Sequence, residues 1–335
     1  MADGRMILRR FISCALFLLL VSGCMSDAVL SRRLAESEAG RGMLLEEDGR
    51  YAEAFDAFRS ALELEPDSLH YRYEASRLAF LAGDVRYGTR QAEALHRRYP
   101  ENVLVSELFA YGCMLEGRDD ESERLYRELL EKHERYGPVA LNLSLLLERR
   151  GAYREAFDIL RPSADEWKDE TVAGFGKRKL YLRLADLASE AFMPGDELIW
   201  LTKALETKGG ADGRAGAASS GPKPSEEAEK QDDESALKLR LAALLADQGE
   251  PGEAVTYYQE LSDAGTLTAE ATFNFARILL VDLERYPEGL EELRLALEAG
   301  FTDDAAIEKL LSEPDLLDPD AIRQVLDASK KGASP

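Results

Sequence analysis

Small and apolar residues recur with a fixed spacing of 34 residues between positions 35 and 170. Within each period, apolar residues three and four apart predict two amphipathic helices, and a glycine lies between them. The positions that repeat in phase are the glycines Gly49, Gly83, Gly117 and Gly151; the small residues Gly42, Ser76, Ala110 and Ser144; the small residues Ala54, Gly88, Ser122 and Ala156; and Phe58, Ala92, Tyr126 and Leu160. A period of this length predicts stacked helix–turn–helix repeats.

Each repeated residue type has a physical role in such a hairpin. Two antiparallel helices approach closely only where their side chains are small, so the small residues predict the crossing point of each pair. A glycine ends the first helix because it adopts the left-handed conformation at the lowest cost. A single hairpin leaves an apolar face exposed, and successive hairpins must therefore stack.

At these positions the chain resembles the tetratricopeptide repeat family. The first repeat departs from the family pattern at Glu38 and Arg41, which suits a terminal repeat with a polar outer face, and the third departs at Asp119 and Ser122. The resemblance implies an all-α fold, a right-handed α-solenoid superhelix of about seven helical hairpins with a C-terminal capping helix. The segments that carry it are Gly49-Arg50-Tyr51-Ala52-Glu53-Ala54 with Phe58 and Ala61 to Pro66, then Ala82-Gly83-Asp84 with Pro100, and Gly151-Ala152-Tyr153-Arg154-Glu155-Ala156.

The periodicity continues beyond residue 170 in diverged form. In the fifth repeat Met193-Pro194-Gly195 replaces the glycine turn, and the turn of the seventh, Asp282 to Pro287, holds one extra residue. The positions that carry the pattern are Tyr181, Leu184, Ala185, Ala188, Leu201, Ala204 and Leu205 in the fifth repeat; Leu241, Ala242, Leu245, Gly249, Ala254, Tyr258 and Leu261 in the sixth; and Phe275, Ala276, Leu279, Gly289, Leu293 and Ala296 in the seventh.

Residues 207–234 contain a low-complexity stretch and a charged run, which predict a disordered segment. We interpret it as a loop extruded from one continuous superhelix, because two repeats alone bury too little surface. A hinge between two blocks is the alternative. The predicted division of the chain is 1–23 signal peptide, 24–34 lipidated tether, 35–206 repeats one to five, 207–234 linker or loop, 235–302 repeats six and seven, and 303–335 capping helices and frayed tail.

A basic flank and a short apolar run precede the repeats. Arg5, Arg9 and Arg10 lie before the apolar run, which is too short to cross a bilayer as a stable helix but fits an export signal. The residues Val21-Ser22-Gly23-Cys24 resemble a bacterial lipoprotein box, which implies cleavage before Cys24, a diacylglycerol on its sulfur and acylation of its amine. An ordinary secretory signal with an incidental cysteine, or a short membrane anchor, is the alternative.

The chain has 335 residues, with 64 acidic against 42 basic side chains and a formal net charge of −22. This surplus argues against binding nucleic acid or anionic lipid through general electrostatics. Cys14 leaves with the predicted signal and Cys24 carries lipid, so Cys113 has no disulfide partner. Its place in the repeat predicts a buried, unreactive thiol.

No constellation of catalytic side chains is evident, and the sequence predicts a protein that is not an enzyme. The three histidines, His70, His96 and His133, have neither a nucleophile nor another histidine at ligand spacing. We therefore expect no metal and no cofactor.

In the tetratricopeptide family, four positions in the first helix of each repeat line a concave groove, and this resemblance implies a partner-binding groove here. Aromatic and arginine side chains in it are common anchors of protein interfaces. It lacks the lysines and asparagines of the subgroup that grips acidic C-terminal peptides, with Asn142 the one near candidate in the first four repeats. The alternative is that the superhelix closes over this strip or that residues 25–34 pack on it. The matching residues are His70, Tyr73, Arg77, Phe80, Leu104, Glu107, Tyr111, Met114, Leu141 and Leu145.

These features predict a lipid-anchored, non-enzymatic scaffold of the bacterial cell envelope that binds an envelope protein or peptide segment. It looks like the tetratricopeptide lipoproteins that assist outer-membrane barrel assembly, secretin assembly or control of peptidoglycan enzymes. In enteric bacteria a residue other than aspartate after the lipidated cysteine directs export to the outer membrane. Met25 fits this rule, so we expect the protein to face the periplasm there. A ligand-handling accessory of a periplasmic solute transporter, which would bind a small molecule, is the alternative.

Overall fold

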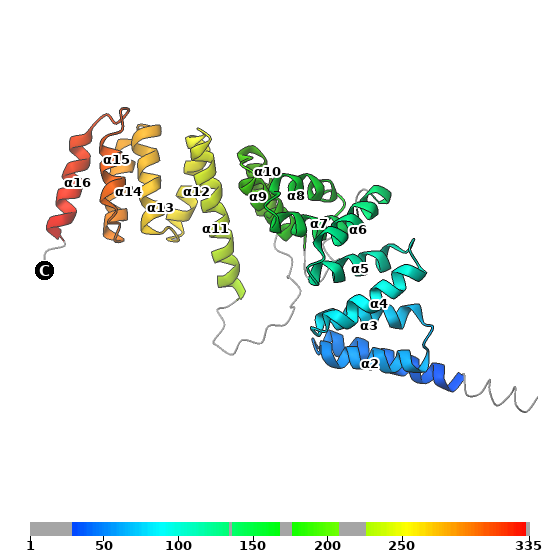
Figure 1. The fold of residues 1–335 in the computed structure, drawn as a ribbon. Coiled ribbons are helices and arrows are strands. Elements are labelled where there is room, and N and C mark those ends of the chain that lie inside the picture. The colour runs from blue at the N-terminus through cyan, green and yellow to red at the C-terminus, as the bar shows by residue number, and fades with distance from the viewer. Residues whose placement is uncertain (1–28, 134–135, 168–175, 208–225, 333–335) are drawn as a thin grey trace, which may run out of the picture. The chain divides into compact units, whose positions relative to one another are not determined.

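The computed structural model describes residues 29–133, 136–167, 176–207 and 226–332. Within these ranges the chain is built of helices and contains no strand (Figure 1). This confirms the predicted all-α helical solenoid. The predicted signal peptide and Cys24 lie outside the described residues, and so does most of the predicted linker.

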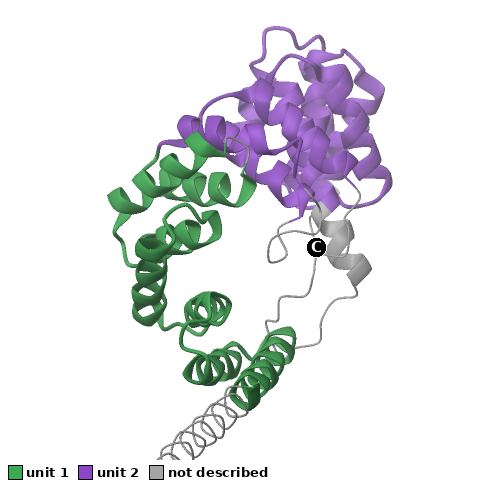
Figure 2. Cartoon of the chain, turned by 90° about the vertical axis from the view of Figure 1, so that its right-hand side faces the viewer, with its two compact units in different colours: residues 1–151 green, residues 152–335 purple. Residues whose placement is uncertain are grey.

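The chain divides into two compact units, Met1–Gly151 and Ala152–Pro335, which Figure 2 colours separately. In the first unit each helix from α2 to α7 packs on the next, and α3 also packs on α5 and α5 on α7. Alternate helices therefore share one side of this unit. Residues 29–47 are helical and are followed by α2 Tyr51–Leu64, α3 Leu69–Leu81, α4 Val85–Arg98, α5 Val103–Leu115, α6 Asp119–Lys132 and α7 Gly137–Arg149.

The second unit continues the antiparallel pairs, with α9 on α10, α11 on α12 and α13 on α14. Among the apolar positions that carry the pattern in repeats five to seven, Leu184, Leu241 and Phe275 are fully buried, whereas Leu205 is half-buried. The elements are α8 Tyr153–Leu160, the 3₁₀ turn η1 Arg161–Ser163, α9 Lys177–Glu190, α10 Pro194–Glu206, α11 Glu226–Asp247, α12 Pro251–Asp263, α13 Ala269–Arg277, the π-helical segment η2 Ile278–Asp282, α14 Tyr286–Glu298, α15 Asp304–Leu311 and α16 Pro319–Gly332.

The turn between paired helices has the predicted glycine geometry. Gly83 has a φ of 87°, and its N–H donates to the carbonyl of Phe80 at 3.1 Å. The next N–H, of Asp84, donates to the carbonyl of Ala79 at 2.8 Å, which completes a Schellman motif. The Asp84 carboxylate then accepts the N–H of Tyr87 at 3.1 Å and caps α4. One short segment thus ends one helix and begins the next.

The repeated small residues lie where paired helices cross. Ser76 on α3 donates its hydroxyl to the carbonyl of Gly88 on α4 at 2.7 Å, and Ser122 on α6 donates to the carbonyl of Ala110 on α5 at 2.8 Å. A Cβ on Gly88 would lie 2.5 Å from the Phe80 ring. The small residues therefore allow both close backbone approach and a hydrogen bond across the pair.

The structure differs from the sequence prediction at three diverged points. Phe192, rather than Gly195, takes the left-handed conformation, with a φ of 56°, because Pro194 already begins α10. The extra residue of the seventh repeat is accommodated by η2, since a π turn adds one residue without breaking the helix. The charged end of the predicted linker is helical from Glu226, in a stretch of good helix formers.

A capping helix closes the C-terminal end, as predicted. Asp318 accepts the N–H of Ala321 at 3.0 Å and starts α16. Ile322 and Leu326 of this helix join the apolar cluster that contains Leu293 and Leu310.

Candidate binding surface

The ten residues of the predicted groove, which we call the inner strip, all lie in the first unit on α3, α5 and α7. The rings of Phe80 and Tyr111 meet edge to face with centroids 5.5 Å apart, so the strip is continuous from α3 to α5. The Glu107 carboxylate on α5 accepts the hydroxyl hydrogen of Tyr136, the residue that precedes α7, at 3.1 Å. Neighbouring repeats thus present these positions side by side.

Three residues of the inner strip are buried and offer almost no surface to a partner. Phe80 is 9% exposed, and Met114 and Leu141 are each 8% exposed. Phe80 occupies the space beside Gly88 and Gly112, where an added Cβ would lie within 3 Å of its ring. The spacing of the sequence does not indicate this burial, and fewer of the ten residues are therefore accessible to a partner than the sequence pattern implies.

Seven residues of the inner strip remain accessible. His70 and Leu104 are exposed, and Leu104 retains 51% of its surface. Tyr73, Arg77, Glu107, Tyr111 and Leu145 are half-buried. The accessible part therefore has two tyrosines and two charged groups near its centre and apolar residues beside them.

Arg77 is held by carboxylates of the protein itself. Its Nη1 and Nη2 donate to the two carboxylate oxygens of Glu46, both at 2.7 Å, and its Nε donates to Glu74 at 2.8 Å. Burial lowers the pKa of Arg77, but the hydrogen bonds that Arg77 donates to Glu46 and Glu74, together with their negative charges, outweigh burial and raise the pKa. The guanidinium of Arg77 thus already has two carboxylate partners within the protein.

Glu107 has the opposite environment. Burial raises the pKa of its carboxyl group above the ordinary 4.5, and the hydrogen bond from Tyr136 opposes that rise. Among the described residues, no cation lies within ion-pair distance of Glu107. Nearby, burial raises the pKa of Tyr73 to about 12, and the charge of Glu107 contributes to that rise.

The residues that the sequence analysis missed here are Glu46, Glu74 and Tyr136. The sequence did contain a signal for Glu46, because opposite charges 31 residues apart pair across neighbouring repeats. Glu46 pairs with Arg77, Asp67 with Arg98, and Glu101 with Lys132 at this separation. No comparable spacing rule identifies Tyr136, whose contact depends on the loop before α7.

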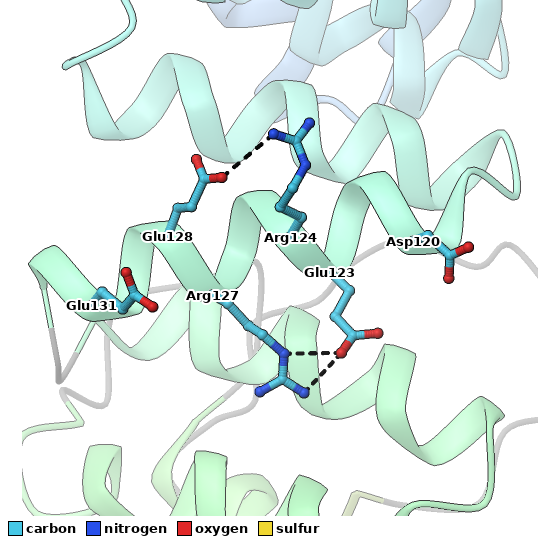
Figure 3. A pocket seen from close by; sticks show the side chains of 6 residues that line it. All are labelled: Asp120, Glu123, Arg124, Arg127, Glu128 and Glu131. Carbon is cyan, nitrogen blue, oxygen red and sulfur yellow. Dashed lines mark hydrogen bonds and ion pairs between the residues drawn. The ribbon is translucent and has the colours of Figure 1, made fainter.

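A shallow depression of about 440 Å³ lies along the polar face of α6 (Figure 3). Its charges are largely neutralised within the helix, because Arg124 pairs with Glu128 and Arg127 with Glu123. It contains no nucleophile or histidine and is separate from the inner strip. All six lining residues come from α6: Asp120, Glu123, Arg124, Arg127, Glu128 and Glu131.

Cys113 is completely buried, as predicted, and burial raises the pKa of its thiol to about 12. In the described ranges, no three His, Cys, Asp or Glu side chains are grouped to hold a metal ion. No helix in the same part of the chain is both long and apolar enough to cross a bilayer.

The turn geometry decides the type of repeat. In the first unit the 34-residue period has become antiparallel pairs such as α3–α4 and α5–α6, which are joined at the left-handed Gly83 and Gly117 and cross at Ser76 and Ser122. The chain has a tetratricopeptide-type fold. No family model and no curated protein matches this sequence.

Several solved structures resemble this tetratricopeptide-type chain. The structure of Naa15/Naa10 bound to HypK-THB is similar with a TM-score of 0.50 and 14% identity, over 89% of this chain and 42% of that one. A tetratricopeptide repeat protein from Parabacteroides merdae has a TM-score of 0.43 and 12% identity, over 88% and 99% of the two chains. A tetratricopeptide repeat protein from Thermus thermophilus has a TM-score of 0.43 and 18% identity, over 63% and 99%. At these identities the likeness concerns the fold.

Proposed function

We propose that this protein is a lipid-anchored, non-enzymatic scaffold of the bacterial envelope that binds another protein on the inner strip of its first unit. The observation that carries the proposal is the accessible surface of Tyr73 and Tyr111 on neighbouring helices α3 and α5. Tyrosine gives a rigid contact area with a polar tip, so it contributes strongly to protein interfaces.

The fold type supports a binding role. Tetratricopeptide-type repeats commonly mediate protein–protein interaction, and the solved structure with a TM-score of 0.50 is itself a complex named as Naa15/Naa10 bound to HypK-THB. The alternative role in handling a small solute would be supported by an enclosed pocket with apolar and polar lining. The depression on α6 has only charged residues around it and gives that alternative no support.

Affinity capture from detergent-solubilised native envelopes tests the binding role. The full chain is compared with a variant carrying Tyr73→Ala and Tyr111→Ala, and with a control carrying Tyr99→Ala, which removes a half-buried tyrosine at the end of α4 outside the strip. Circular dichroism serves to check that all three baits have equal helicity. We expect a protein that is retained by the wild type and the control and lost from the double variant. Equal retention by all three baits would contradict a role for the inner strip.

The anchor has a separate test, because its residues lie outside the described part of the chain. The basic flank, the apolar run and Cys24 support lipidation, and several acyl chains bound to one cysteine would hold the protein on a membrane. We expect radiolabelled palmitate to be incorporated into the wild type but not into Cys24→Ser. That variant should also leave the membrane fraction. Labelling that persists in Cys24→Ser would contradict the proposed anchor.

A further inference from the structure

Glu107 is an acidic group on the inner strip that no cation of the described chain neutralises. It is half-buried on α5, and its recorded hydrogen bond comes from the neutral hydroxyl of Tyr136. Removing a carboxylate from water without a positive partner costs free energy. A folded protein keeps such a group more readily at a functional site than as part of its packing.

Four tyrosines, on α3, α5, α6 and just before α7, lie near this carboxylate. Tyr111 is one helical turn further along α5 and therefore lies on the same face as Glu107. Tyr73 comes from α3 and Tyr136 from the start of α7. Tyr126 on α6 is completely buried, and the charge of Glu107 contributes to the rise in its pKa, after burial itself.

The charge balance of the inner strip favours a positively charged ligand. Arg77 is the one arginine or lysine among the ten residues of the inner strip, and it is already bound by Glu46 and Glu74. Glu46 and Glu74 bind this guanidinium, and Glu107 is a further carboxylate with no cation beside it in the described residues. The whole chain, with a net charge of −22, adds a long-range attraction for a positive ligand.

We propose that the inner strip binds a basic side chain, arginine or lysine, of a partner polypeptide, with its cation paired to Glu107 and lying against the rings of Tyr73 and Tyr111. A carboxylate beside aromatic rings is the chemistry that recognises an ammonium or guanidinium group, because ring faces attract cations. This inference rests on the proposed function and specifies the chemistry of its partner. A metal ion is a poorer match, since Glu107 belongs to no group of three potential ligands in the described residues.

A double-mutant cycle on selected peptides tests the pairing. Twelve-residue peptides are selected by messenger-RNA display on the immobilised full chain in neutral detergent, and one binder is synthesised with each arginine replaced by citrulline or each lysine by norleucine. Affinities are then measured for the wild type, Tyr73→Ala, Glu107→Gln and Glu131→Gln. The last variant removes the same charge from an exposed position on α6 and is the matched control.

We expect one basic residue of the peptide to contribute about tenfold or more in affinity with the wild type and with Glu131→Gln, and little with Glu107→Gln. Equal losses in the two protein variants would show general attraction to an acidic chain and overturn the inference. Peptides that depend on Tyr73 but not on Glu107 would overturn it while leaving the proposed function intact. A selection that enriches no peptide would count against both.

Discussion

Two charged residues of the inner strip, Arg77 and Glu107, differ in what surrounds them rather than in where the repeat places them. Arg77 has two carboxylates within hydrogen-bond distance, whereas Glu107 has the hydroxyl of Tyr136. Arg77 is therefore a structural link from α3 to the preceding repeat. Glu107 is a site with unsatisfied charge, and this has a measurable consequence for stability.

We predict that Glu107→Gln stabilises the folded protein at neutral pH. Burial raises the folded-state pKa of Glu107 above the ordinary 4.5, so the folded chain binds a proton more readily than the unfolded chain. The free energy of unfolding therefore falls as the pH rises from 4.5 through the raised pKa, and the loss is complete above it. The amide oxygen introduced by Glu107→Gln would accept the Tyr136 hydrogen without carrying the charge.

Urea denaturation of the wild type, Glu107→Gln and Glu131→Gln at neutral pH and below pH 4.5 checks this. The gain from Glu107→Gln should be present at neutral pH and absent below the ordinary glutamate pKa. Glu131→Gln should change the free energy of unfolding by less than about 0.5 kcal/mol, since exposed substitutions are usually neutral. A destabilised Glu107→Gln at neutral pH would show that the carboxylate has a stabilising partner.

Phe192 provides a second test at the scale of one residue. It holds a φ of 56° and is 93% exposed, so it has backbone strain and almost no packing in return. Phe192→Gly should raise the free energy of unfolding by about 1 kcal/mol, because glycine adopts the left-handed region without a Cβ clash. Phe192→Ala is the control and should give no gain, since alanine keeps the Cβ. Equal stability of the two variants would contradict the strain.

At the scale of the element, the helical hairpin depends on small residues at its crossing. The Ser76 hydroxyl reaches the carbonyl of Gly88 at 2.7 Å because both residues are small enough for α3 and α4 to approach closely. Phe80 then packs against the bare backbone of Gly88. Packing therefore requires glycine at position 88, although glycine is intrinsically unfavourable inside a helix.

We predict opposite effects for two Gly→Ala substitutions in helices of the first unit. Gly88→Ala should lower the free energy of unfolding by about 1–3 kcal/mol, because its Cβ would collide with Phe80. Gly40→Ala, where nothing lies within 4 Å, should raise it by up to about 1 kcal/mol through better helix propensity. Urea denaturation measures both, and a stabilising Gly88→Ala would rule out the tight crossing.

At the scale of the whole molecule, net charge opposes compactness. There are 64 acidic and 42 basic side chains, and most ion pairs, such as Arg32 with Glu36, are exposed and contribute little. The surplus carboxylates repel one another at low ionic strength. A basic partner would reduce this repulsion when it binds.

We predict that added sodium chloride raises the midpoint temperature of unfolding. Increasing the salt from about 0.01 M to about 0.15 M shortens the Debye length from about 30 Å to about 8 Å and screens the repulsion. The loss of exposed ion pairs acts in the opposite direction but is smaller, since each contributes about 0–1 kcal/mol. Differential scanning calorimetry at both salt concentrations is the measurement. A lower midpoint at the higher concentration would mean that the ion pairs dominate.

The sequence by itself determined the repeat, its helices and its turns, because these depend on local rules. Gly83 ends α3, Asp84 caps α4 and Ser76 marks the crossing, each through contacts within a few residues or within one hairpin. The left-handed conformation of Phe192 was not predicted. Pro194 begins α10, and the repeat period does not specify this start.

Only the tertiary structure decided which residues of the inner strip are open and which are charged without compensation. The burial of Phe80 depends on Gly112 in the next repeat, and the neutralisation of Arg77 depends on Glu46 in the preceding one. Periodicity places a side chain on a face, but solvent access and electrostatic partners come from neighbouring repeats and loops. Glu107 and Tyr136 are therefore in contact because α5 packs against α7, and the spacing of the sequence does not indicate this contact.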